Sequence, residues 1–252
     1  MNKRIRALVK RILPAPVLRQ IQIYRQGMPV ADADVAAAWE FKRAFFWAAF
    51  RVLDFNGIDG DYAEFGSHGG MTFRLAFDQI RQRGIRRHMW AFDSFRGLPD
   101  SSSPMDYHPK WKKGFMATNV DAFHRICRRH GIPGDAYTVV QGYYEETLTR
   151  MPDDASPSNI AFAYVDCDMY SSTRTVLKFL APRLKHGMIL AFDDYFCWSA
   201  NQISGERRAL LEVLASDKKW NLMRYRDIGW AGTSFVIERA DKVPLDMQFE
   251  KL

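Results

Sequence analysis

Two apolar stretches of the chain each end in a pair of aspartates. They are residues 164–170, YVDCDMY, and residues 187–195, GMILAFDDY. Short apolar runs of this composition are typical of buried strands, so the acids are expected at the ends of two strands. These four acids are Asp166, Asp168, Asp193 and Asp194.

Carboxylates buried beside a sheet core cost free energy unless a positive charge compensates them. Neither stretch contains a lysine or an arginine. Hard cations such as Mg²⁺ bind carboxylate oxygens and leave coordination sites open for a substrate, so the pattern predicts a metal-assisted active site. The alternative, that the acids cap following helices and face water, accounts well for any one of them and poorly for two pairs.

Length and composition favour one large α/β domain. A chain of 252 residues buries one sizeable core and would be cramped as two domains. The hydrophobic content of 47% is that of a globular protein, and no apolar run approaches the roughly 18 residues of a membrane-spanning helix. We expect a single domain at residues 34–252 after an N-terminal extension at residues 1–33.

The net charge of +7 is confined to the N-terminal extension. Residues 1–31 contain no acid, and the rest of the chain is electrically neutral. A nucleic-acid enzyme would more often carry a basic patch around its cleft, so no nucleic-acid partner is predicted. Apolar residues at helical spacing between Ile5 and Ile12 indicate a short basic amphipathic segment. Packing on the core or on a second subunit is the preferred interpretation, and contact with an anionic membrane surface is the alternative.

The three cysteines, Cys127, Cys167 and Cys197, are odd in number and lack metal-ligand spacing. The N-terminus lacks the apolar core of a secretory signal. Both observations predict reduced thiols and a cytoplasmic protein.

Strand-like and helical patterns alternate along most of the chain, which predicts a parallel sheet covered by helices on both faces. A helix is expected at residues 34–55, and further helices should begin near residues 69, 118, 171 and 204. Two strands linked by a short glycine-containing turn should close the sheet as an antiparallel pair. The expected strands are 61–66, 87–92, 136–141, 159–166, 187–192, 220–226 and 233–238.

Two motifs follow the first two expected strands. The segment 64–70, EFGSHGG, offers glycines for close backbone approach to a ligand and leads into a helix N-terminus. Asp93 ends the next strand, where an acid can accept hydrogen bonds from ribose hydroxyls. Residues 98–118 show little periodicity, and a segment of that length is expected to be a lid.

Five motifs, taken in order, resemble the macrocin O-methyltransferase family. They are Glu-x-Gly-x-x-Gly-Gly at 64–70, Asp-Ser-Phe-x-Gly-Leu-Pro at 93–99, Gly-x-x-x-x-Thr-Leu at 142–148, Asp-x-Asp-x-Tyr-x-Ser-Thr at 166–173 and Asp-Asp-Tyr at 193–195. The resemblance covers roughly residues 60–240. It implies a class I methyltransferase fold, a Rossmann-like three-layer sandwich whose seven-stranded sheet ends in an antiparallel strand.

The resemblance also implies roles for individual residues. Asp166, Asp193 and Asp194 would bind Mg²⁺, and Asp168 would be the general base. The cofactor S-adenosylmethionine would lie along the glycine turn and the end of the second strand. Its expected binding residues are Glu64, Gly66, Ser67, Gly69, Gly70, Asp93 and Ser94.

The function implied is methylation of a sugar hydroxyl in a glycoside, oligosaccharide or polysaccharide, and a homo-oligomer is expected. The alternatives are a catechol-type O-methyltransferase and a non-catalytic binder of S-adenosylmethionine or glycan. The role of His68 stays open. Aromatic residues that could stack on a pyranose, or lie in the core, are Tyr143, Tyr144, Tyr195, Trp198 and Trp230.

Overall fold

The computed structural model describes residues 30–101, 103–214 and 217–243, with side chains from residue 33 onward. The predicted amphipathic segment between Ile5 and Ile12 lies outside the described residues. The chain divides into two compact units, Met1–Phe41 and Lys42–Leu252. Helix α3 (Val30–Phe55) crosses this boundary, and the architecture below concerns the second unit.

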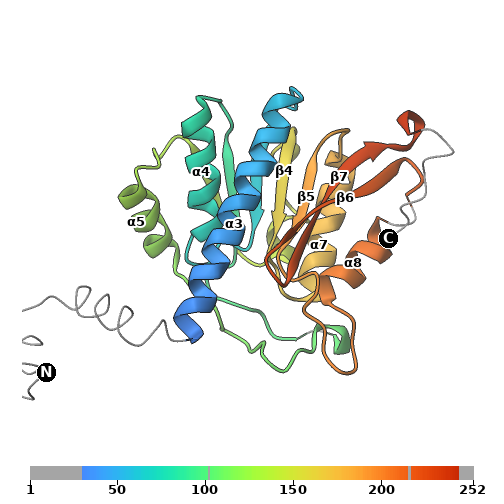
Figure 1. Ribbon diagram of the computed structural model, residues 1–252. Coiled ribbons are helices and arrows are strands. Elements are labelled where there is room, and N and C mark those ends of the chain that lie inside the picture. Colours follow the sequence, from blue (N-terminus) through green and yellow to red (C-terminus); the bar gives the residue numbers. More distant parts are fainter. Residues whose placement is uncertain (1–29, 102, 215–216, 244–252) are drawn as a thin grey trace, which may run out of the picture. The chain divides into compact units, whose positions relative to one another are not determined.

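Seven strands form one sheet in the order β3-β2-β1-β4-β5-β7-β6 (Figure 1). Strands β1 to β5 pair in parallel, whereas β7 runs antiparallel to both of its neighbours. The predicted seven-stranded sheet with an antiparallel last strand is therefore confirmed. The strands are β1 (Asp61–Phe65), β2 (Met89–Asp93), β3 (Tyr137–Gln141), β4 (Ile160–Val165), β5 (Ile189–Phe192), β6 (Trp220–Ile228) and β7 (Gly232–Arg239).

Helices connect the strands nearly where the sequence patterns place them. The other α-helices are α4 (Met71–Arg83), α5 (Val120–His130), α6 (Tyr144–Thr147), α7 (Tyr170–Leu180) and α8 (Gly205–Val213). Short 3-10 turns occupy Pro104–Asp106, Asp153–Ala155, Ala181–Arg183 and Ala240–Lys242. Helix α3 begins at Val30 rather than at Asp34, where the sequence pattern places it. The four-residue helix α6 was not predicted, because it is too short to produce a periodic signal in the sequence.

Alternating side chains on the central strands pack against different helices on the two faces of the sheet. On one face, the aromatic rings of Phe46 and Phe50, from the second part of α3, contact the ring of Phe162 on β4. On the other face, Phe65 of β1 stacks on Phe92 and meets Phe179 of α7. This burial on both faces explains why the β4 and β5 segments are almost continuously apolar.

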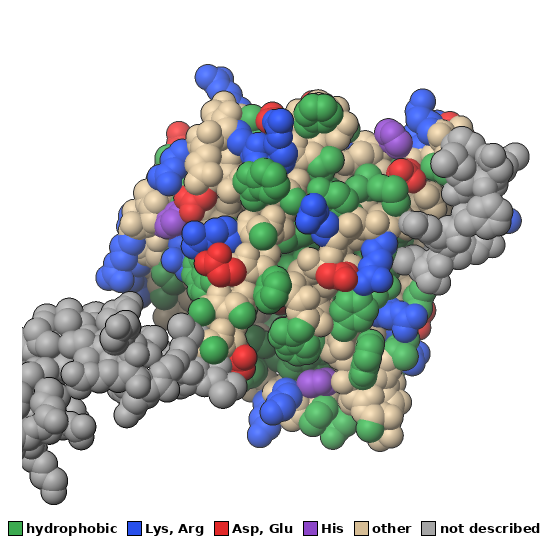
Figure 2. All heavy atoms as spheres, viewed as in Figure 1, with side chains coloured by type: hydrophobic (Ala, Val, Ile, Leu, Met, Phe, Trp, Pro, Cys, Tyr) green, Lys and Arg blue, Asp and Glu red, His purple; other side chains and the backbone are tan. Residues whose placement is uncertain are grey.

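The surface of the described residues shows mixed charge. Figure 2 shows lysine and arginine side chains scattered among acidic and hydrophobic ones on one face, with no continuous basic stripe among the described residues there. No described helix is both long enough and apolar enough to cross a membrane. Two large apolar side chains of helix α3, Trp47 and Phe55, are exposed. The expected homo-oligomer stays a prediction.

Candidate active site

Three of the four predicted acids meet at the carboxyl edge of the sheet. Asp166 and Asp168 follow β4, and Asp194 follows its parallel neighbour β5. One carboxylate oxygen from each lies within 4.8 Å of the other two. Asp168 is 6% exposed and has a φ of 59°, a left-handed conformation that aspartate tolerates better than most residues. Such a conformation is often found in functional loops.

The cluster of Asp166, Asp168 and Asp194 is chemically suited to a divalent cation. Burial raises the pKa of Asp194 to about 6, and the charge of Asp193 adds to this shift. Burial also raises the pKa values of Asp166 and Asp168 well above the usual aspartate range. Ionised carboxylates are thus disfavoured at this place unless a cation compensates them. Closely spaced oxygen donors of this type fit Mg²⁺.

Asp193 lies differently from the other three acids. Its Oδ2 accepts a hydrogen bond of 2.8 Å from Lys42 Nζ on helix α3, and its Oδ1 accepts one from the Tyr164 hydroxyl. Burial acts to lower the pKa of Lys42, but Asp193 and Asp166 outweigh it, so the net pKa is raised and the ammonium stays charged. Neither acidic stretch contains a basic residue, and Lys42, from a distant helix, supplies part of the compensating positive charge.

Glu206, at the start of α8, connects the two acidic loops. Its side chain is completely buried. Oε2 accepts a hydrogen bond of 2.8 Å from the backbone N–H of Asp194, and Oε1 accepts one of 3.3 Å from the N–H of Cys167. Ser204 Oγ also donates to the Asp194 carbonyl at 2.7 Å. In the sequence, Glu206 has the appearance of an ordinary first-turn helix acid, so nothing there signalled this role.

The glycine turn between β1 and α4 lies against the Asp166 loop. Gly66 has a φ of 95°, and a Cβ atom there would lie 1.9 Å from the backbone oxygen of Asp166. Only glycine permits so close an approach of the two strand ends. Gly70 (φ 63°) sits at the N-cap of α4, whereas Gly69 has open space around it.

Asp93 fastens this turn to the end of β2. Its Oδ2 accepts hydrogen bonds from the backbone N–H groups of Ser67 (2.7 Å) and His68 (3.1 Å), and its Oδ1 accepts one from Phe95 N–H (2.6 Å). Ser94 Oγ donates to the carbonyl of Gly97 at 2.9 Å. The structure thus brings the predicted cofactor residues of 64–70 and 93–94 together at one edge.

Glu64 and His68 lie on opposite sides of the turn. Glu64 is completely buried and accepts a hydrogen bond from the Tyr62 hydroxyl. Burial raises the pKa of Glu64 to about 8, although the bond from Tyr62 opposes that shift. His68 is exposed, and its Nδ1 lies 3.2 Å from Thr118 Oγ1 at the end of the predicted lid. Glu64 therefore supports the turn from the core, while His68 contacts the lid segment.

The predicted lid segment is anchored beside the acids. Apart from the turn Pro104–Asp106, its described residues form no helix or strand. Asp106 is 2% exposed, and its carboxylate accepts hydrogen bonds from Ser171 N–H (2.8 Å) and Ser171 Oγ (2.9 Å) at the start of α7. This contact places the segment next to the loop that carries Asp168.

The aromatic candidates divide between core and surface. Tyr144 is buried, with its hydroxyl 3.3 Å from the Phe92 carbonyl, and Tyr195 is 6% exposed. Trp198 and Trp230 are 58% and 83% exposed, respectively. The Arg96 guanidinium lies over the ring of Tyr143, 5.4 Å from its centroid.

The sequence that forms this site matches a known protein family. A family model described as Macrocin-O-methyltransferase (TylF) matches residues 45–210, which contain both acidic loops and the glycine turn. The chain belongs to the macrocin O-methyltransferase family. The resemblance drawn from the five motifs is thereby confirmed.

Two curated proteins are similar in sequence to this macrocin O-methyltransferase family member. The first is an 8-demethyl-8-(2,3-dimethoxy-alpha-L-rhamnosyl)-tetracenomycin-C 4'-O-methyltransferase of Streptomyces olivaceus, to which the chain is 28% identical over 146 residues. The matched residues make up 56% of this chain and 54% of that relative. The chain is 26% identical over 167 residues to a demethyldecarbamoylnovobiocin O-methyltransferase of Streptomyces niveus, covering 63% and 62% of the two chains. The matched part spans less than two thirds of either relative.

Solved structures share the fold of this family member. The O-methyltransferase NovP has a TM-score of 0.67 at 22% identity, over 79% of this chain and 80% of that one. The calicheamicin methyltransferase CalS11 has a TM-score of 0.64 at 22% identity, over 91% and 89%. These likenesses confirm the predicted class I methyltransferase fold.

Proposed function

We propose that the protein transfers a methyl group from S-adenosylmethionine to a hydroxyl of a sugar, with Mg²⁺ at the acidic cluster. The observation that carries this proposal is the meeting of Asp166, Asp168 and Asp194 at the sheet edge that also holds the glycine turn. Membership of the macrocin O-methyltransferase family supports it. One curated relative is named for methylation of a rhamnosyl group, which supports a sugar acceptor.

In this proposal, S-adenosylmethionine binds along the turn at Gly66–Gly70. Asp93 fixes the backbone there through three N–H groups, and its Oδ1, which accepts only one of these hydrogen bonds, retains a lone pair for a ribose hydroxyl. The N-terminus of α4 presents free N–H groups that suit the carboxylate of the methionine part. Glu64 stays beneath the turn and keeps its shape.

The metal would be held by Asp166 and Asp194, with Asp193 completing the set as the family resemblance implies. Each Asp193 oxygen already accepts one hydrogen bond and retains a lone pair for a cation. Bound Mg²⁺ would supply Lewis acidity that lowers the pKa of a sugar hydroxyl. Asp168 then accepts the hydroxyl proton, while the hydrogen bond from Lys42 orients Asp193.

A transfer assay tests the proposed function. The protein is incubated with methyl-labelled S-adenosylmethionine and a panel of neutral and charged glycosides and catechols, with Mg²⁺ or with a chelator. We expect label in a glycoside, loss of transfer with the chelator, and recovery on adding Mg²⁺. Labelling of a catechol alone, or transfer that ignores the chelator, would contradict the proposal.

Glu206→Gln is expected to weaken Mg²⁺ binding about 10- to 100-fold, the usual range for residues that orient metal ligands. A carboxyl group accepts hydrogen bonds from both Cys167 N–H and Asp194 N–H, whereas an amide nitrogen cannot accept one. One acidic loop therefore loses its anchor. Affinity for S-adenosylhomocysteine should stay within about twofold; calorimetry measures both.

Two further variants separate positioning from charge. Glu206→Asp keeps the charge but is too short to reach both loops, so it should resemble the glutamine variant. Glu145→Gln removes an exposed charge and should leave Mg²⁺ affinity unchanged. Full Mg²⁺ affinity in Glu206→Asp would show that charge alone matters and would refute the positioning role.

A further inference from the structure

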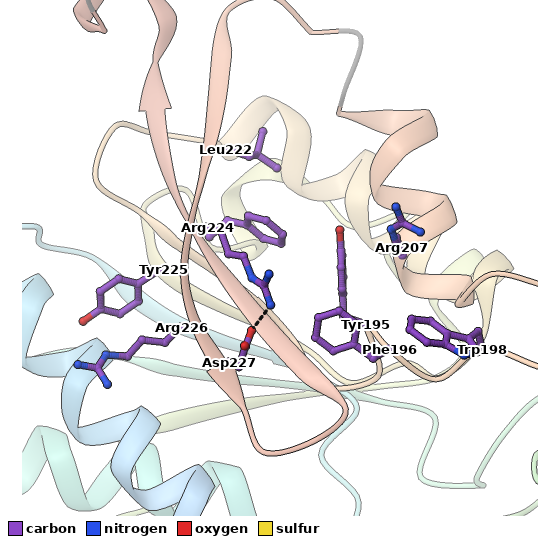
Figure 3. Close-up of a pocket in the computed structure, with 10 residues that line it drawn as sticks. Tyr195, Phe196, Trp198, Arg207, Leu222, Arg224, Tyr225, Arg226 and Asp227 are labelled. Atoms are coloured by element: carbon purple, nitrogen blue, oxygen red, sulfur yellow. Dashed lines mark hydrogen bonds and ion pairs between the residues drawn. The ribbon is translucent and has the colours of Figure 1, made fainter. Parts of the chain in front are cut away.

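A cavity of about 720 Å³ opens beside the Asp194 loop, between α8 and the edge strand β6. Its walls come from the segment after Asp194, from the first turns of α8 and from the β6–β7 hairpin (Figure 3). This volume lies within the range of small-molecule sites. The residues that line it are Tyr195, Phe196, Trp198, Arg207, Leu222, Arg224, Tyr225, Arg226, Asp227 and Phe235.

The cavity combines aromatic rings with excess positive charge. Three arginines line it against a single acid, Asp227. Arg224 pairs with Asp227 at 2.6 Å and lies 5.6 Å from the ring centroid of Phe196. Within the described part of the chain, Arg207 forms no ion pair. Guanidinium groups in such a setting bind phosphate or carboxylate well, because their N–H groups match two oxygens at once.

Arg207 and Arg224 act on the same part of the cavity although they come from different elements. Burial raises the pKa of the Tyr195 hydroxyl. Arg207 opposes this shift through a hydrogen bond and its charge, and Arg224 opposes it through its charge. Figure 3 shows Tyr195 and Phe196 lying between the two guanidinium groups. An anion seated here would meet two cationic side chains, with the exposed ring of Trp198 as a stacking surface for a sugar or a base.

The cavity is near the acidic cluster yet separate from it. Strand β6 lies two positions from β5 in the sheet, which corresponds to about 10 Å at the usual strand spacing. The turn after Asp194 bridges this gap, because Cys197 N–H donates to the Asp194 carbonyl and Phe196 N–H to the Ala231 carbonyl. An anion would be repelled by the acids and attracted by the arginines. A charged acceptor would thus be oriented with its neutral hydroxyl toward the acids.

We propose that this cavity binds an anionic group of the acceptor, a phosphate or a carboxylate, attached beyond the sugar that is methylated. The inference rests on the proposed sugar methylation and narrows its substrate class. The acceptor is then larger than one neutral pyranose, since it must reach from the acids to Arg207 and Arg224.

Calorimetry without Mg²⁺ or cofactor tests the cavity with three probes: uridine diphosphate glucose, digalacturonate and maltose. We expect one of the anionic probes to bind at least tenfold more tightly than neutral maltose. The double variant Arg207→Gln/Arg224→Gln should lose this advantage. If uridine diphosphate glucose binds in an arginine-dependent way, the acceptor carries a phosphate. If digalacturonate does, the acceptor carries a carboxylate. S-adenosylhomocysteine should not displace the probe.

The double variant Arg81→Gln/Arg239→Gln is the matched control, because it removes the same charge at exposed ion pairs whose residues do not line the cavity. The single variant Arg207→Gln repeats the test without touching the Arg224–Asp227 pair. Equal binding of maltose, binding that the arginine variants leave unchanged, or displacement by S-adenosylhomocysteine would overturn the inference. A separate titration with S-adenosylhomocysteine distinguishes this failure from failure of the proposed methyltransferase function, which would abolish that binding in the unaltered protein.

Discussion

Asp168→Asn is expected to lower methyl transfer by about 10²- to 10⁴-fold, the range attributed to a lost general base. Asparagine keeps the shape of the side chain and tolerates the left-handed φ of 59°, so the loop should retain its conformation. The amide cannot accept the hydroxyl proton. Binding of S-adenosylhomocysteine and Mg²⁺ should stay within about threefold of the unaltered protein, as measured by calorimetry beside the transfer assay.

This variant also decides between two roles for Asp168, because its carboxylate lies in the cluster that could hold the metal. A loss of Mg²⁺ affinity of tenfold or more would make Asp168 a metal ligand. Asp193 would then serve as the partner of Lys42 and not as a ligand. Unchanged transfer would remove the base assignment altogether. Asp154→Asn, which changes an exposed acid outside both loops, serves as the control and should have no effect.

Gly66→Ala is expected to destabilise the fold by about 2 to 5 kcal/mol, from backbone strain and overpacking together. Its φ of 95° is unfavourable for alanine, and the added Cβ would lie 1.9 Å from the Asp166 backbone oxygen. Relief of that clash requires the ends of β1 and β4 to separate, which displaces Asp166. Small domains have about 5 to 15 kcal/mol of stability, so a large fraction would be lost.

Gly69→Ala is the matched control within the same turn. Its φ is not in the left-handed region, and a Cβ atom there would meet no atom within 4 Å. Chemical denaturation should show Gly69→Ala within about 0.5 kcal/mol of the unaltered protein, as expected for a surface substitution. If Gly66→Ala unfolds at the same denaturant concentration as Gly69→Ala, the close approach of the two strand ends is not a structural requirement.

The sheet could be predicted from the sequence because its signals are local. Buried parallel strands such as 160–165 are continuous apolar runs, and the closing pair is marked by Gly229 and Gly232. Acids at the ends of adjacent parallel strands meet by topology, so the gathering of Asp166, Asp168 and Asp194 followed from the strand assignment.

The partners of those acids could not be predicted because they come from distant segments. Lys42 reaches Asp193 across 151 positions, and it lies in a helix that also carries other charged residues. Glu206 acts through backbone N–H groups, which have no sequence signature. Likewise, pattern alone does not distinguish buried Tyr144 from exposed Trp198, since both are aromatic residues that lie between two strands.

The metal site is tested most directly by titrating Mg²⁺ into the protein saturated with S-adenosylhomocysteine, for the unaltered chain and for Asp166→Asn. We expect one Mg²⁺ site in the unaltered protein and at least a tenfold weaker site in the variant, with cofactor affinity preserved. Asp154→Asn should match the unaltered protein. Cofactor binding without any Mg²⁺ binding, or Mg²⁺ binding that Asp166→Asn leaves unchanged, would contradict it.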